Sequence, residues 1–264
     1  MIGHHQRMPI TIRYDHDPVT SAPRPIAAQA LWAMAGEVRR QLLSSHGRGA
    51  VGDDGASQAH LGLTLEMLCA GSRMVVVNGR RVQVSWDMSH EVHDGTGNPV
   101  LGVCETDPDM PESALVSINA RMVAARPELA LSTAAHELGH VVFDVPAALG
   151  EAGRRFRAVT RGAEVLLDPS AMQAERRANE FMGALLVPAV PLHLRMLAHA
   201  RTEGLRTAHA AHHGRQGSRV LAAENQSEAV AGVIAALAGD FGVSESFIRV
   251  RLARYRLVQG GLRP

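Results

Sequence analysis

The feature that most constrains this chain is a cluster of two histidines and a glutamate inside a strongly apolar stretch. In the run His136-Glu-Leu-Gly-His140 the histidines are four residues apart, and the positions around them are small or apolar. In an α-helix, residues i and i+4 lie one turn apart on the same face. Burying three ionisable groups without partners costs several kcal/mol. The chain must therefore fold so that this helix is enclosed and its three polar groups find a ligand.

The spacing of the cluster predicts a metal site. Two imidazoles on one helix face can bind the same zinc ion at about 2.0–2.1 Å. Glu137 is rotated by about 100° from His136 around the helix axis, so its carboxylate reaches a water on the metal instead of the metal itself. We therefore predict His136 and His140 as zinc ligands and Glu137 as the catalytic base.

A catalytic zinc site has three protein ligands and a water, so a third ligand is expected. The best candidate is Glu175, 35 residues after His140 on another predicted helix. Asp144 and Asp168 are rival candidates. Asn179 lies one turn after Glu175 and is expected either to hold the distal nitrogen of a ligand histidine or to pack in its helix.

Two observations exclude other classes of enzyme. The longer motif of the metzincins requires glycine and histidine where this chain has Phe143 and Pro146. All 27 basic residues are arginines, because the sequence contains no lysine. That absence excludes Schiff-base chemistry, a Ser-Lys dyad and the lysine-dependent phosphate loops and kinases.

Hydrophobicity and cysteine usage favour a cytoplasmic protein. Cys69 and Cys104 are too few for a disulfide framework, and residues 1–13 lack the apolar region of a signal peptide. No apolar run approaches the roughly 18 residues that a membrane span needs. We expect a reducing compartment and no membrane partner.

Hydrophobic periodicity predicts an α+β protein with a small antiparallel sheet in its middle third. Helices are expected over residues 26–42, 63–68, from 127 to before 146, and over 151–165, 170–186, 192–203 and 227–257, with a loop over 47–62. Strands are expected over 74–77, 81–86, 100–104 and 115–119, the first two joined by the turn Asn78-Gly79. The predicted organisation is an N-terminal arm (1–22), a domain that contains the candidate metal site (23–191) and a helical C-terminal subdomain (192–264).

Two segments then carry a family resemblance. They are Ala135-His-Glu-Leu-Gly-His140 and Glu175-Arg-Arg-Ala-Asn-Glu-Phe-Met-Gly-Ala-Leu-Leu-Val-Pro188. Together with Phe241-Gly-Val-Ser near the C-terminus, they resemble the ImmA/IrrE-type metallopeptidases over about residues 70–257. The resemblance implies a zincin-like fold in which a small sheet packs on the motif helix, with a helical C-terminal extension.

The same resemblance implies residue roles and a substrate class. It gives His136, His140 and Glu175 as zinc ligands and Glu137 as general base. It further implies that the substrate is a helix-turn-helix transcriptional repressor encoded nearby. Its cleavage would switch on stress, mobile-element or antiphage-defence genes.

Cys104 is a candidate for holding the enzyme latent. It lies on a predicted strand that should run next to the motif helix, where a thiolate could occupy the open position on zinc. This placement resembles that of peptidases paired with repressors in nucleotide-signalling antiphage operons. The alternative is a buried cysteine that acts as a small hydrophobic residue.

The C-terminal segment supports an alternative function. Residues 192–264 hold 10 arginines against 5 acidic residues, a net charge of +5, whereas residues 1–191 have a net charge of −4. Residues 237–257 have helix-turn-helix character, which would suit DNA, but their apolar positions form a core face at helical spacing. We favour packing or partner recognition there. A DNA-binding regulator with structural zinc, and a non-proteolytic zinc scaffold, are the alternatives.

His90 and His93 form a second histidine pair. Three residues apart on a strand, they would face opposite sides of the sheet. Loop histidines or contacts in a substrate cleft are therefore expected rather than a second metal site.

Overall fold

The computed structural model describes residues 8–45, 62–110, 112–150, 155–161, 169–212 and 215–260, with only the backbone at 215–217. The described chain clusters into two compact units. The first comprises residues 8–45 and 64–182, and the second residues 62–63 and 183–260. The expected boundary after residue 191 therefore lies inside the second unit, within helix α7 (Ala189–Thr202).

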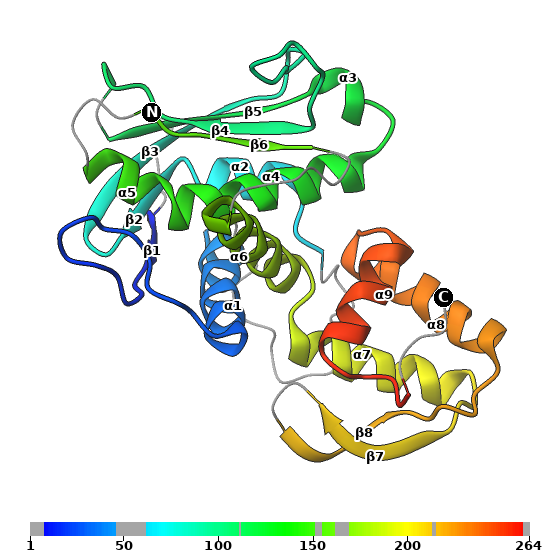
Figure 1. Cartoon of the computed structure of the whole chain (residues 1–264). Coiled ribbons are helices and arrows are strands. Elements are labelled where there is room, and N and C mark those ends of the chain that lie inside the picture. The colour runs from blue at the N-terminus through cyan, green and yellow to red at the C-terminus, as the bar shows by residue number, and fades with distance from the viewer. Residues whose placement is uncertain are drawn as a thin grey trace, which may run out of the picture. The chain divides into compact units, whose positions relative to one another are not determined.

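The first unit is built on a six-stranded sheet (Figure 1). Its strands are β1 (Ile10–Ile12), β2 (Met74–Val77), β3 (Arg80–Asp87), β4 (Gly102–Glu105), β5 (Ser113–Ile118) and β6 (Arg157–Thr160), in the order β1-β2-β3-β5-β4-β6. The pairs β1–β2 and β3–β5 are parallel and the other three are antiparallel. The sheet is therefore mixed, and two edge strands join the four predicted ones. Part of the expected N-terminal arm forms β1.

The predicted turn between β2 and β3 is confirmed. Asn78 and Gly79 both have positive φ, 51° and 88°, which is typical of the turn that closes a two-residue hairpin. Along β3 the side chains of Val82 and Val84 are buried, whereas that of Gln83 is exposed. This alternation shows that one face of the sheet carries the core.

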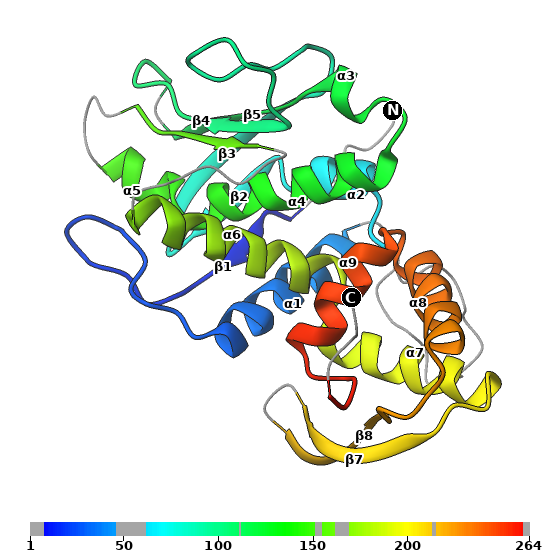
Figure 2. The same cartoon turned by 45° about the vertical axis from the view of Figure 1, so that its right-hand side comes forward.

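Helices cover that core face. They are α1 (Ala28–Ser44), α2 (Leu65–Gly71), α4 (Pro127–Phe143) and α6 (Pro169–Leu186), and both views place them on the same side of the sheet (Figures 1 and 2). The short helices α3 (Ala120–Val123) and α5 (Val145–Gly150) flank α4 in the chain. All four major helices are close to their predicted ranges, and α4 begins at Pro127 as expected. The motif helix α4 contacts β4, β5 and β6, so the α+β, zincin-like arrangement with a sheet packed on this helix is confirmed.

The expected helix over residues 151–165 is wrong where the structure describes it. Residues 157–160 form β6, which pairs antiparallel with β4. The hydrogen bonds of these residues with β4 at the edge of the sheet override their local preference for a helix. The flanking residues 151–154 and 162–168, and most of the expected loop over 47–62, lie outside the described residues.

The second unit adds a hairpin to the predicted helices. Its elements are α7, β7 (Thr207–His212), β8 (Arg215–Leu221), α8 (Ser227–Phe241) and α9 (Glu245–Arg254). The hairpin was not predicted, because alternating alanines and histidines in β7 carry little strand propensity. Gly242, at φ +66°, ends α8, and the Ser244 hydroxyl accepts a hydrogen bond from the Phe247 amide at the start of α9. The helical region expected over 227–257 is thus two helices separated by a turn, as the helix-turn-helix character of residues 237–257 indicated.

Among the described residues, no single helix is both long and apolar enough to cross a membrane. Two bent pairs, α6 with α7 and α8 with α9, pass that length and composition criterion only when each pair is taken together.

Candidate metal centre

Helix α4 is buried along most of its length. Pro127 is at its N-terminus, where its missing N–H costs nothing, and Glu128 in the first turn complements the helix dipole. His136, Glu137 and His140 are 4%, 0% and 1% exposed. The expectation that this helix is enclosed is met, so its three ionisable side chains depend on protein partners or a ligand.

A third polar group meets the two histidines. Glu175 on α6 approaches both rings: Oε2 lies 3.2 Å from Nε2 of His136 and Oε1 lies 3.3 Å from Nε2 of His140. The two Nε2 atoms are 3.1 Å apart. All three ligand atoms are within 4.8 Å of one another, and this is the one such group found among the described residues. The structure thus brings together the three residues that the sequence predicted as ligands.

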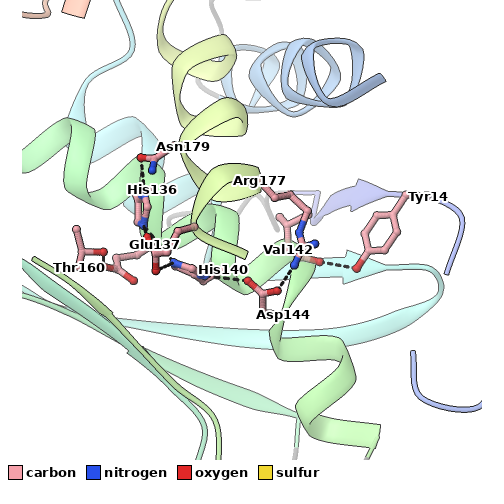
Figure 3. A network of polar contacts seen from close by, with 10 residues as sticks. Tyr14, His136, Glu137, His140, Val142, Asp144, Thr160, Arg177 and Asn179 are labelled. Atoms are coloured by element: carbon pink, nitrogen blue, oxygen red, sulfur yellow. Dashed lines mark hydrogen bonds and ion pairs between the residues drawn. The ribbon is translucent and has the colours of Figure 1, made fainter. Parts of the chain in front are cut away.

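Each histidine also has a partner on its distal nitrogen (Figure 3). Nδ1 of His136 lies 3.1 Å from Oδ1 of Asn179, and Nδ1 of His140 lies 2.8 Å from Oδ2 of Asp144. An oxygen acceptor at Nδ1 holds a proton there and fixes the ring with Nε2 toward the centre, where Nε2 can share a proton with Glu175 or, once deprotonated, bind a metal. Asn179 therefore lies where the sequence placed it.

Asp144 is not placed as a ligand. It contacts His140 from the side opposite Glu175, and Arg177 of α6 bonds to its other oxygen. The alternative of Asp144 as third ligand is not supported, because at the end of α4 its side chain reaches the distal nitrogen of His140 and not the centre. The other rival, Asp168, lies outside the described residues.

The electrostatics of the group favour a bound cation. Although burial opposes ionisation, hydrogen bonds from His136 and His140 lower the pKa of Glu175 to about 2. Burial likewise opposes charge on His140, but its hydrogen bonds with Asp144 and Glu175 outweigh burial and raise its pKa to about 10. Positive charge is therefore stabilised between the three side chains, which is the condition that a divalent metal needs.

Glu137 lies beside this group with one oxygen engaged. Its Oε1 accepts a 2.6 Å hydrogen bond from the hydroxyl of Thr160 on β6. Its Oε2 is buried and has no hydrogen-bond partner among the described residues. Burial raises the pKa of Glu137, against the pull of His140 and His136. An orphaned buried carboxylate oxygen next to two imidazoles and a carboxylate fits a metal whose remaining position is open to solvent or substrate.

A comparison with known protein families identifies the family of this chain. The profile of the IrrE N-terminal-like domain, a peptidase family, matches residues 108–253, more than half of the chain. The chain belongs to this family. The matched range contains α4, β6 and α6, and therefore every residue of the candidate centre. No curated protein matches the chain.

Family membership confirms the resemblance seen in the sequence and makes the chain a metallopeptidase-type protein. The matched family and the group of His136, His140 and Glu175 together indicate a metal. Two imidazoles and one carboxylate form a ligand set of the kind that catalytic zinc uses.

Cys104 lies near the candidate metal centre but does not belong to the group of His136, His140 and Glu175. It is fully buried on β4, paired across the sheet with Val116 and Ala158. Residues two apart on a strand share a face, and Gly102, two residues before Cys104, faces Glu137. The thiol therefore points to the same side as the motif helix. Burial raises its pKa.

His90 and His93 are surface residues. Nδ1 of His90 lies 2.8 Å from a carboxylate oxygen of Asp87, and His93 is half-exposed near Glu91. Neither belongs to a group of potential metal ligands in the described part of the chain. Their placement agrees with the expectation of loop histidines.

Thr160 and Gly102 are contacts of Glu137 that sequence reasoning missed. Single threonines and glycines in short strands carry no pattern that links them to a motif elsewhere in the chain. Only the register of β4 and β6 on α4 reveals them.

Proposed function

We propose that this protein is a zinc-dependent endopeptidase. One observation carries the proposal: His136, His140 and Glu175 converge within 4.8 Å, beside buried Glu137, one of whose carboxylate oxygens has no hydrogen-bond partner in the described part of the chain. This combination supplies both a ligand set and a proton acceptor, whereas a structural zinc site would use four closed ligands and need no base.

The residues of the site have separate tasks. When bound, zinc supplies Lewis acidity and lowers the pKa of a coordinated water to about 7. Asn179 and Asp144 keep the two imidazoles oriented through their Nδ1 atoms. Oε2 of Glu137 accepts the proton of the attacking water and returns it to the leaving amine. The other oxygen, Oε1, accepts the hydrogen bond from the hydroxyl of Thr160.

The direct test is Glu137→Gln. The amide cannot accept the proton, so cleavage of a mixed library of unstructured peptides, read by mass spectrometry, should be lost while zinc content remains one ion per chain. Glu66→Gln, an exposed glutamate on α2, is the matched control and should cleave normally. Cleavage retained in Glu137→Gln would refute the mechanism.

The proposed substrate is a helix-turn-helix repressor, whose cleavage would derepress stress, mobile-element or antiphage-defence genes. Support comes from the family resemblance and from the basic second unit, which suits an acidic surface on a partner. Co-expression with a small helix-turn-helix protein encoded beside this gene should yield two fragments of that protein. Intact partner in the presence of peptide-cleaving enzyme would reject the substrate but not the activity.

Cys104 is proposed to hold the enzyme latent. Its support is the position on β4, on the side facing α4. Because Sγ is not part of the ligand group, latency requires a shift of β4 or of the metal toward the thiol. Cys104→Ser should raise basal peptide cleavage and remove activation by oxidant; equal behaviour of variant and wild type would exclude the switch.

DNA contact by the second unit is a second candidate function. Helices α8 and α9 meet at 103° across the three-residue turn 242–244, within the range of helix-turn-helix motifs. Arg254 and Arg256 are exposed toward the C-terminal end of α9. A duplex-binding titration across salt concentrations tests this role, because phosphate contacts give a steep slope. Binding that does not depend on salt, or no binding, argues for protein recognition instead.

A further inference from the structure

Two neighbouring strands contact the side chain of Glu137. Gly102 of β4 and Thr160 of β6 are paired across the sheet. Thr160 donates its hydroxyl to Oε1 of Glu137 at 2.6 Å. Gly102 lies so close that a Cβ there would be 2.6 Å from the same oxygen and 2.8 Å from Cγ2 of Thr133. One cross-strand pair therefore contacts the carboxylate from two sides.

The contact with Thr160 is separate from the pairing of its strand. The backbone carbonyl of Thr160 already accepts a hydrogen bond from the Leu101 amide. The strand therefore keeps its position through the backbone, and the hydroxyl is available to Glu137. Valine has the same shape and an equal or higher strand propensity, so the sheet alone does not require a hydroxyl at this position.

The contact with Gly102 requires the absence of a side chain. A distance of 2.6 Å to a Cβ is shorter than any ordinary contact, and Thr133 leaves no room on the other side. Any side chain at 102 would force Glu137 to turn or α4 to move away from the sheet. Glycine here serves the close approach of a strand to a buried carboxylate.

We propose that Thr160 and Gly102 are positioning residues for Glu137, an inference that rests on the proposed peptidase function and deepens it. A carboxylate is nearly symmetric, and its terminal torsion is broad. A donor on Oε1 and a tight wall beside it select one orientation, in which Oε2 has no partner within the described ranges of the chain. Thr160 thereby assigns the two oxygens different tasks before any substrate arrives.

The test compares Thr160→Val with Thr160→Ser in the full-length, zinc-loaded protein. Loss of a hydrogen bond to a charged group should lower kcat by about 10–100-fold, measured on one peptide that the wild type cleaves from the mixed library. KM and zinc affinity should stay within about twofold, and serine should restore most of kcat. Thr11→Val, on the opposite edge strand of the same sheet, is the matched control and should have wild-type kcat.

A second readout does not depend on activity. In the metal-free protein, the infrared band of the Glu137 carboxyl group, assigned by its loss in Glu137→Gln, should shift in Thr160→Val and return in Thr160→Ser. If Thr160→Val does not fold, Thr160→Ala removes the hydroxyl without adding bulk and should show the same shift. Gly102→Ala should displace the same band and lower kcat.

The outcomes separate the two proposals. A wild-type protein that cleaves nothing, or a Glu137→Gln variant that still cleaves, overturns the peptidase function. A wild type that cleaves, combined with a folded Thr160→Val variant of unchanged kcat and unchanged infrared band, overturns the positioning inference alone. Failure of serine to restore kcat also overturns it.

Discussion

At the scale of single residues, each ligand of the candidate centre has its own support. His136 is backed by Asn179 and His140 by Asp144, which in turn is held by Arg177. A carboxylate or amide behind a histidine fixes the ring and makes it a stronger ligand. The pair Asp144–Arg177 also ties the end of α4 to α6, so one ion pair supports both a ligand and the contact between two helices.

This arrangement predicts the effect of Asp144→Ala. Without the acceptor at Nδ1, His140 loses its fixed tautomer and orientation, and zinc affinity should fall by about 10–100-fold. Competition with a chromogenic chelator measures that affinity. Asp109→Ala, at an exposed loop position, is the control and should bind as the wild type does. An unchanged affinity in Asp144→Ala would show that the contact with His140 is incidental.

Residue-level prediction from the sequence worked where the signal was local. The spacing of His136 and His140 determines that both face one point, whatever surrounds the helix. Glu175 was the best candidate for the third ligand because it lies on a separate predicted helix, whereas Asp144 lies at the end of the motif helix itself. Thr160 had no signal at all, because its contact with Glu137 depends on the register of β6, a strand that the sequence did not indicate.

At the scale of elements, the centre depends on how closely α4 and α6 approach. A Cβ on Gly139 of α4 would lie 2.9 Å from Cα and 3.1 Å from Cβ of Ala178 on α6. These two small residues let the helix axes come together, and that proximity brings Glu175 to the histidines of α4. The glycine between the two histidines is therefore part of the site, although it has no side chain.

Gly139→Ala should push the two helices apart. Overpacking of this kind costs about 1–3 kcal/mol of unfolding free energy, and zinc affinity should fall with it because Glu175 moves with α6. Urea unfolding and the chelator competition measure the two effects. Gly36→Ala is the matched control: it lies within α1 of the same unit with nothing within 4 Å of its added Cβ. It should be neutral or stabilising by up to about 1 kcal/mol.

Helices α7 and α8 are joined by an ion-pair cluster whose effect depends on pH. Asp240 of α8 accepts hydrogen bonds from Arg195 and lies 2.7 Å from Nε2 of His199, both on α7. Burial opposes ionisation of Asp240, but these partners lower its pKa below the usual value. A folded-state pKa below the unfolded one gives stability that is present above pH about 4 and is lost as the pH falls through the folded pKa.

Asp240→Asn should therefore lower the Tm of the second unit at pH 7, with the difference from wild type shrinking as the pH falls below about 4. Calorimetry between pH 3 and 7 measures this convergence. Asp15→Asn, at an exposed ion pair of the first unit, should show no such trend in the second unit's transition. A difference that stays constant with pH would mean that the amide acts through packing instead of charge.

Elements with strong periodicity were predictable, and elements defined by their partners were not. The helices α1, α4 and α6 and the hairpin β2–β3 follow from apolar spacing, Pro127 and Asn78-Gly79. Strands β6 and β7 were missed because four to six residues with mixed propensity become strands only by pairing with β4 and β8. The parallel pairing of β1 with β2 could not be predicted from the sequence either, because it joins segments more than 60 residues apart.

At the scale of the whole molecule, metal binding and folding should be coupled in the first unit. The ligands come from two separate helices, α4 and α6, so the unfolded chain does not hold the three side chains together. A ligand that binds only the folded state stabilises it by about 2.7 kcal/mol at 100 times its Kd. The metal is thus expected to contribute to stability as well as to chemistry.

Chelation should accordingly lower the Tm of the first unit by roughly 5–10 °C, and added zinc should restore it. Differential scanning calorimetry of the full chain, with and without chelator, measures the shift. The double variant His136→Ala, His140→Ala should melt at the same temperature in both conditions. If the Tm of the wild type is the same with chelator and with added zinc, the three side chains do not bind zinc.

The separation of α4 and α6 along the chain also has a consequence for protein synthesis. Glu175 is translated 35 residues after His140, roughly 2–7 s later at 5–20 residues per second. During that interval a ribosome-bound chain has both imidazoles and the base but lacks the third ligand. The nascent polypeptide is therefore expected to stay without proteolytic activity until α6 emerges. The centre can be complete only when the first unit has been synthesised.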